Sequence, residues 1–77
     1  MKLYSWDEIE NRLCEVTHLP GPSCTWRHVL TYQNGVQEYR SDRNHVSLEV
    51  EAVNLADANR RMFEASEDYR NMAGPAA

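Results

Sequence analysis

Two cysteines and two histidines have a spacing that suggests a zinc site. Cys14, His18, Cys24 and His28 follow the pattern C-x3-H-x5-C-x3-H, and thiolate and imidazole are the usual ligands of structural zinc. If Cys24 and His28 lie on one extended strand, they are about 13 Å apart at about 3.3 Å per residue. Zinc ligands must all lie within about 2.0–2.3 Å of one ion. We therefore expect two reduced thiols, no metal and no cofactor.

The sequence offers little for catalysis. Asp42 and His45 flank one polar turn and could form an acid–base pair, but a solvated turn gives such a pair no walls that exclude water. The chain contains no glycine-rich phosphate loop, no H-E-x-x-H motif and no G-x-S-x-G motif. The residue pattern therefore predicts a protein that is not an enzyme.

The size and charge of the chain limit its function further. Its 77 residues suffice for one domain over residues 1–77, which would bury about 60 % of the unfolded surface and leave no room for a deep pocket. The mean hydropathy is −0.72, and no apolar run is long enough to span a membrane. Because Met1 to Tyr4 lead directly into acidic residues without an apolar signal segment, we expect a cytoplasmic location. The net charge of −4 argues against a protein that binds phosphate backbones.

The N-terminal segment has the pattern of an amphipathic helix. Ser5 and Glu8 fit a capping box, and residues 19–22 contain two prolines and a glycine that cannot continue a helix. The spacing predicts a helix over about residues 6–18, with an apolar stripe of Trp6, Ile9, Leu13 and Val16.

The middle of the chain predicts a β-hairpin and a third strand, over about residues 25–33, 36–41 and 46–53. Asn34-Gly35 favours a two-residue turn, which would place Leu30 opposite Tyr39. One face would then carry Trp26, His28, Leu30, Tyr32, Gln37 and Tyr39. The other would carry Arg27, Val29, Thr31, Gln33, Val36, Glu38 and Arg40. In the third strand, strict alternation turns Val46, Leu48, Val50 and Ala52 inward and Ser47, Glu49 and Glu51 outward.

A second helix is predicted over about residues 55–72. Asn54 is its expected N-cap, Gly74-Pro75 would end it, and residues 74–77 should fray. Its apolar stripe consists of Leu55, Ala58, Met62, Ala65, Tyr69 and Met72. The elements together predict an α+β fold: an α-β-β-β-α two-layer sandwich in which a three-stranded antiparallel meander carries both helices on one face.

Candidate binding residues lie on two predicted surfaces. The uncovered sheet face would present a mixed-charge patch around two valines, which suits a protein partner; its members are Val29, Val36, Glu38, Arg40, Glu49 and Glu51. The second helix offers an acidic group formed by Glu64, Glu67 and Asp68. Phe63 lies one position off the apolar stripe of that helix, so we expect it to be partly exposed.

The predicted element order resembles that of the double-stranded RNA-binding domain. In that family a basic cluster at the start of the second helix contacts phosphates. Here that position reads Asn54-Leu55-Ala56-Asp57-Ala58-Asn59, and Arg60-Arg61 follow a turn later beside Asp57 and Glu64. The resemblance implies RNA binding as one alternative function.

In size, charge and lack of catalytic motifs, the chain is similar to the small acidic inhibitors of phages and mobile elements, such as anti-CRISPR and anti-restriction proteins. This similarity implies a non-catalytic inhibitor in the bacterial host cytoplasm, either a monomer or a homodimer. Its partner would be a basic nucleic-acid-binding complex, most simply a CRISPR effector. An accessory or assembly subunit is a further alternative.

Overall fold

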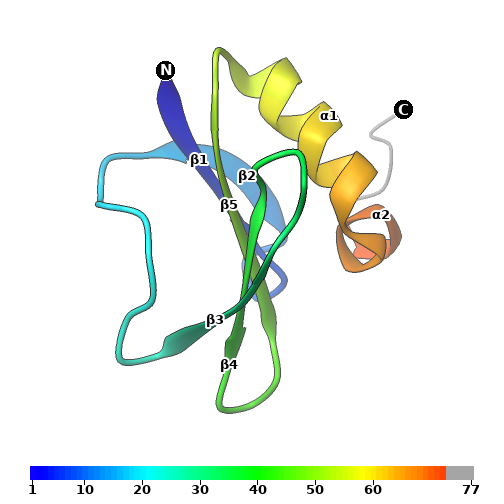
Figure 1. Cartoon of the computed structure of the whole chain (residues 1–77). Coiled ribbons are helices and arrows are strands. Elements are labelled where there is room, and N and C mark those ends of the chain that lie inside the picture. Colours follow the sequence, from blue (N-terminus) through cyan, green and yellow to red (C-terminus); the bar gives the residue numbers. More distant parts are fainter. Residues whose placement is uncertain (73–77) are drawn as a thin grey trace.

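The structure is a computed structural model that describes residues 1–72. This part of the chain forms one antiparallel sheet of order β2-β1-β5-β4-β3 and two helices (Figure 1). The strands are β1 (Lys2–Asp7), β2 (Arg12–Val16), β3 (Trp26–Thr31), β4 (Gln37–Ser41) and β5 (Val46–Ala52), and the helices are α1 (Leu55–Ala65) and α2 (Glu67–Met72). The predicted α+β class is confirmed. The three-stranded meander and the α-β-β-β-α order are wrong.

The predicted N-terminal helix is instead the β1–β2 hairpin. Asp7 closes its turn, because the Asp7 carboxylate accepts a hydrogen bond from the Glu10 amide at 2.7 Å and the Asp7 carbonyl accepts one from the Asn11 amide at 2.7 Å. Asn11 adopts a φ of +52°, a conformation that asparagine tolerates better than most residues. β1 pairs with β2 on one side and β5 on the other, a pairing that the helical periodicity of the segment does not reveal.

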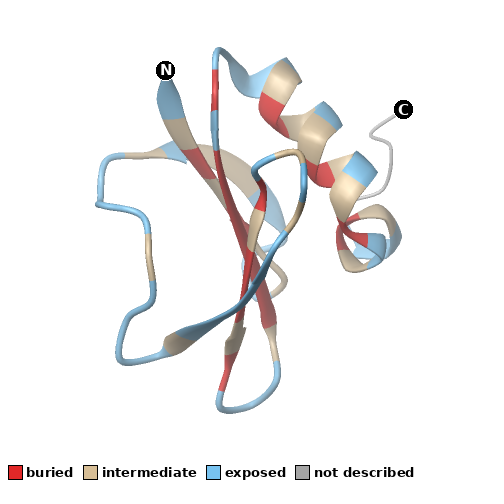
Figure 2. Ribbon diagram, in the orientation of Figure 1, coloured by how far each residue is buried: buried red, intermediate tan, exposed pale blue. Residues whose placement is uncertain are grey.

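The core lies between the sheet and the helices (Figure 2). The inward-facing set predicted for the third strand is confirmed, since its members are all buried: Val46, Leu48, Val50 and Ala52. Ser47 and Glu49, predicted to face water, are also buried, at 7 % and 6 % exposed. The inward-facing residues belong to one cluster with Tyr4 and Trp6 from β1 and Ala58, Met62 and Tyr69 from the helices. Trp6 meets Tyr69 edge to face, with 5.1 Å between the ring centroids.

The β3–β4 hairpin does not have the predicted two-residue turn. The Tyr32 amide donates to the Val36 carbonyl at 2.7 Å, and the Gly35 amide donates to the Tyr32 carbonyl at 3.0 Å. Gly35 has a φ of +97°, which glycine adopts at no steric cost. Three residues, 33–35, therefore form the loop, a common alternative to a two-residue turn.

This longer loop moves β4 by one residue relative to β3, and such a shift exchanges the two faces of a strand. Leu30 pairs with Glu38, not with Tyr39. A register shift between His28 and Leu30 then changes the facing of β3 at Val29. The pairing of β4 with β5 places Glu38 beside Leu48 and Arg40 beside Val46. Val36, Glu38 and Arg40 therefore face the helices, and Gln37 and Tyr39 face the other side, which is the reverse of the predicted arrangement.

The predicted C-terminal helix is two helices that meet at Ser66. Asn54 caps α1, since its side chain accepts from the Asp57 amide at 2.9 Å, which confirms the predicted start. Ser66 is extended (φ −116°, ψ 124°), and its hydroxyl accepts from the Tyr69 amide at 3.2 Å, as an N-cap of α2 does. The helix end predicted at Gly74-Pro75 and the fraying predicted for residues 74–77 lie outside the described residues.

The apolar stripe predicted for the C-terminal helix is only partly buried. Ala58, Met62 and Tyr69 belong to the core, whereas Leu55 and Met72 are exposed. Within residues 1–72, neither α1 nor α2 has the length and apolar character needed to cross a membrane.

Candidate functional site

The residues expected to form one outer sheet surface are divided between the two faces of the sheet. Val36 is fully buried in the core, and Glu38 is 5 % exposed on the helix side of β4. Glu49 is 6 % exposed on the opposite side, and Glu51 is exposed next to it. Val29 is exposed on the edge strand β3. The expectation that these side chains share an uncovered face is therefore wrong.

Glu38 belongs to a polar network that fastens α2 to the sheet. Its carboxylate accepts a hydrogen bond from the Tyr32 hydroxyl at 2.5 Å and pairs with Arg40 Nε at 3.0 Å. The same guanidinium reaches Asp68 of α2, with 3.1 Å between Nη2 and Oδ2. Burial, together with the hydrogen bond to Glu38 and its negative charge, raises the pKa of Tyr32 to about 12.

This network makes a prediction for alkaline titration. Because the folded chain holds the Tyr32 proton more tightly than the unfolded chain, where the tyrosine pKa is about 10, the stabilisation is complete below about pH 10 and is lost as the pH rises toward the folded pKa of about 12. Tyrosinate absorbance should show that Tyr32→Phe removes a group titrating near pH 12. If the group that disappears titrates near pH 10, Tyr32 is not held by Glu38.

Glu49 is covered by the segment that connects β2 to β3. Its two carboxylate oxygens contact His18 Nε2 at 2.7 Å and the Gly21 amide at 3.2 Å. This segment, the light-blue to cyan loop at the left of Figure 1, thus packs onto the sheet face opposite the helices. A single sequence gives no signal for that contact, since 31 positions separate His18 from Glu49.

The four residues with zinc-like spacing are dispersed. Cys14 lies on β2 and Cys24 is exposed in the loop before β3. His28, on β3, contacts the ring of Tyr39 with 5.5 Å between centroids. Within residues 1–72, no three His, Cys, Asp or Glu side chains are placed to hold a metal ion.

The acidic residues of the second helix lie where α1 and α2 meet. Glu64 and Glu67 are exposed, and the side chain of Asp68 is half exposed. Glu64 lines two shallow hollows of about 290 Å³ each, one beside Phe63 and one beside Ala65. Phe63 is partly buried against the core, as expected. We call Phe63, Glu64, Ala65, Glu67 and Asp68 the junction surface.

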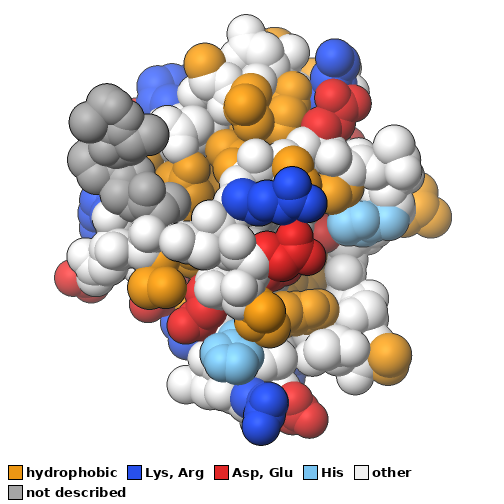
Figure 3. Space-filling view, turned by 180° about the vertical axis from the view of Figure 1, so that it is seen from behind, with side chains coloured by type: hydrophobic (Ala, Val, Ile, Leu, Met, Phe, Trp, Pro, Cys, Tyr) orange, Lys and Arg blue, Asp and Glu red, His pale blue; other side chains and the backbone are white. Residues whose placement is uncertain are grey.

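Acidic side chains are not clustered on every face of the molecule. Seen from behind, the described part of the surface shows acidic groups dispersed among basic and apolar ones (Figure 3). In the sequence, the junction surface brings three acidic side chains together within five positions of the chain.

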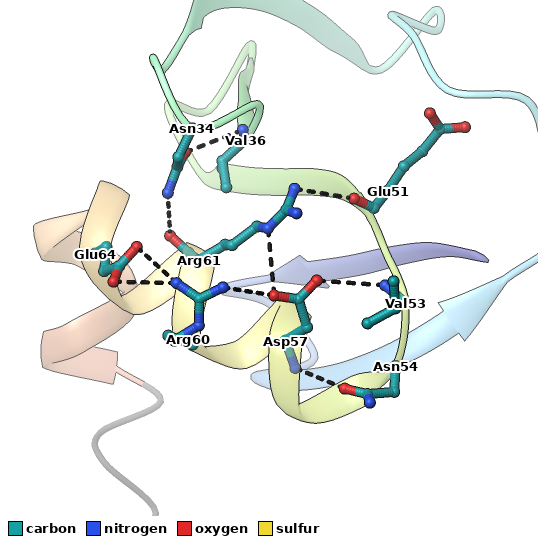
Figure 4. Close-up of polar contacts among 9 residues, drawn as sticks. All are labelled: Asn34, Val36, Glu51, Val53, Asn54, Asp57, Arg60, Arg61 and Glu64. Carbon is teal, nitrogen blue, oxygen red and sulfur yellow. Dashed lines mark hydrogen bonds and ion pairs between the residues drawn. The ribbon is translucent and has the colours of Figure 1, made fainter. Parts of the chain in front are cut away.

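Asp57 holds the other end of α1 in place. Arg60 and Arg61 both point toward its carboxylate (Figure 4), with N–O distances of 2.7 Å and 3.4 Å. Burial acts to raise the pKa of Asp57, but the Val53 amide and the two guanidiniums outweigh it and keep that pKa below its usual range. Arg61 also donates to the Glu51 carbonyl at 3.3 Å.

These contacts bear on the basic residues of α1. Arg60 is engaged by Glu64 as well as by Asp57, so both arginines of the Arg60-Arg61 pair are paired within the chain.

Searches for similar proteins found no matching family model, no matching curated protein and no matching solved structure.

Proposed function

We propose that this protein is a non-catalytic inhibitor that binds a basic, nucleic-acid-binding complex of bacterial defence, such as a CRISPR effector, through the junction surface. The observation that carries the proposal is a group of three acidic side chains near the meeting point of α1 and α2, of which Glu64 lies beside Phe63 and Arg60 in a shallow hollow and Glu67 is exposed. An apolar centre with a charged rim suits a protein interface, and negative charge favours a basic partner.

The junction surface is also held rigidly, which lowers the entropic cost of binding. Asp68 is fixed to the sheet through Arg40, and Arg70 donates to the Phe63 carbonyl at 2.6 Å. Ser66, between the two helices, is 1 % exposed. A partner would therefore meet acidic groups whose backbone is already in place.

Charge reversal at Glu67 tests the proposal. A tagged chain is used to capture its partner from bacterial lysate, mass spectrometry identifies that partner, and association is then measured with the purified complex. We expect Glu67→Lys to slow association roughly tenfold at low salt, with a smaller difference at high salt, because the interaction is electrostatic.

Glu51→Lys is the matched control. It makes the same change of charge at another exposed glutamate, on the sheet face opposite the helices. If both variants slow association equally, the effect comes from net charge and the junction surface is not the binding site.

Two further measurements address the alternatives. A gel shift with duplex RNA and duplex DNA at low salt should show no tight complex, because both arginines of the Arg60-Arg61 pair are engaged within the chain. Tight, salt-sensitive binding would instead indicate a nucleic-acid module. An obligate dimer in light scattering, with no captured partner, would indicate an assembly subunit.

A further inference from the structure

Asn34-Gly35, the dipeptide that predicted a two-residue turn, lies in the loop at residues 33–35 and joins this loop to α1. Asn34 Nδ2 donates a hydrogen bond to the Arg61 carbonyl at 3.0 Å (Figure 4). Asn34 Oδ1 accepts one from the Val36 amide at 3.3 Å. Because 27 positions separate Asn34 from Arg61, the side-chain amide is a tertiary contact as well as a part of the turn.

The chemistry of an Asn-Gly sequence allows a covalent change at this point. The backbone nitrogen of Gly35 can attack Cγ of Asn34 and form a new N–C bond, while the Cγ–Nδ2 bond breaks and the amide proton leaves with Nδ2 as ammonia. Water then opens the cyclic imide at either carbonyl, which gives an aspartate or an isoaspartate. Glycine favours the attack because it has no side chain to hinder its nitrogen.

Three contacts restrain this reaction in the folded chain. The Gly35 amide donates to the Tyr32 carbonyl at 3.0 Å, which keeps its proton in place. The Arg61 carbonyl holds Nδ2, the group that must leave. The Arg61 guanidinium lies beside Gly35, with Nη1 3.8 Å from the position that a Cβ on Gly35 would occupy, and it is itself fixed by Asp57 and the Glu51 carbonyl. The loop must therefore separate from α1 before the reaction can occur.

We propose that Asn34 is a site of spontaneous deamidation that α1 restrains: the reaction takes place when the loop separates from Arg61 while the rest of the chain stays folded. Gln33 and Gly35, on either side of Asn34, are exposed, and a local opening needs less free energy than global unfolding. The product lacks the Nδ2 donor that joins the loop to α1. It also adds a carboxylate to the hollow that Asn34 shares with Glu64. The proposal does not depend on the function proposed above.

The test follows the Asn34 peptide of the full chain, incubated at neutral pH either folded or unfolded in guanidinium chloride. Mass spectrometry detects the change from amide to carboxyl, and chromatography separates isoaspartate from aspartate. In denaturant we expect Asn34 to react faster than the other asparagines, each of which precedes a larger residue: Asn11, Asn44, Asn54, Asn59 and Asn71. In the folded chain we expect the same products at a rate roughly ten to one hundred times lower, because the rate follows the population of the open loop.

Arg61→Met should raise the rate in the folded chain several-fold, since it removes the guanidinium beside Gly35 and loosens α1 at Asp57. Arg60→Met is the matched control: Arg60 belongs to the same helix but pairs with Asp57 and Glu64, so the rate should be unchanged. In full denaturant all three chains should react equally, because they share the same dipeptide.

Low concentrations of denaturant separate a local opening from global unfolding. Below the unfolding midpoint the rate should hardly change, because a local opening exposes little surface. A rate that rises in proportion to the unfolded fraction would overturn the proposal. It is also wrong if Asn34 does not react in denaturant, if the folded chain reacts as fast as the unfolded chain or forms no product, or if the Arg61→Met rate equals that of the wild type or of Arg60→Met.

Discussion

Replacing Trp6 with alanine is expected to lower the free energy of unfolding by about 3–5 kcal/mol, the range for truncating a large aromatic residue in a core. Trp6 is 1 % exposed and packs edge to face on Tyr69, so it joins β1 to α2. Its indole nitrogen has no hydrogen-bond partner within residues 1–72, and the loss is therefore one of packing. A small domain has a total stability of the same order. Urea denaturation followed by circular dichroism measures the effect.

Ile9→Ala is the matched control, because both residues belong to the same predicted helical stripe. A helix over residues 6–18 would bury both, whereas the hairpin leaves Ile9 63 % exposed in its turn. We expect Ile9→Ala to change the free energy of unfolding by less than about 0.5 kcal/mol. A large loss at both positions would favour the helix and contradict the β1–β2 hairpin.

The parts of the fold that could be predicted are those whose local pattern agrees with their place in the structure. Strict alternation in residues 46–52 identified β5 and its buried face, and β5 is paired on both sides. Asn54 identified the start of α1 because the cap is a local hydrogen bond. In both cases the information lies within a few neighbouring residues.

The N-terminal hairpin could not be predicted in the same way, because its sequence fits two periods. Trp6 and Leu13 fit a helical stripe, yet they also oppose each other across β1 and β2. Alternation of Tyr4 with Trp6 and a turn-forming Asn11 were signals of the hairpin. What decides between the two is the pairing of β1 with β5, in which partners are 40 to 50 positions apart.

The prediction of the candidate site failed because of strand register and the position of one loop. The pairing of β4 with β5 moved Glu38 to the helix face, beside Leu48, and the segment around His18 covered Glu49. Neither change alters composition or alternation, so the sequence pattern could not reveal them. The exposure of Glu64 and Glu67 was predicted from the helical pattern alone, and both residues are exposed in the structure.

Replacing Arg40 with methionine is expected to lower the free energy of unfolding by about 2–3 kcal/mol. Removing one partner of a fully buried pair costs about 3–5 kcal/mol, and the value is smaller here because the Arg40 side chain is 25 % exposed. The variant leaves the carboxylate of the buried Glu38 without its countercharge. It also releases Asp68 of α2, and urea denaturation gives the cost.

Arg60→Met provides the comparison, because Arg60 also bridges two carboxylates, those of Asp57 and Glu64. Its side chain is 59 % exposed, so the loss should stay below about 1 kcal/mol. Combining Glu38→Gln with Arg40→Met should restore part of the stability, since a buried amide needs no countercharge and still accepts the Tyr32 hydroxyl. Equal losses for the two arginine variants, or no recovery in the double variant, would show that Arg40 acts by packing and not by neutralising Glu38.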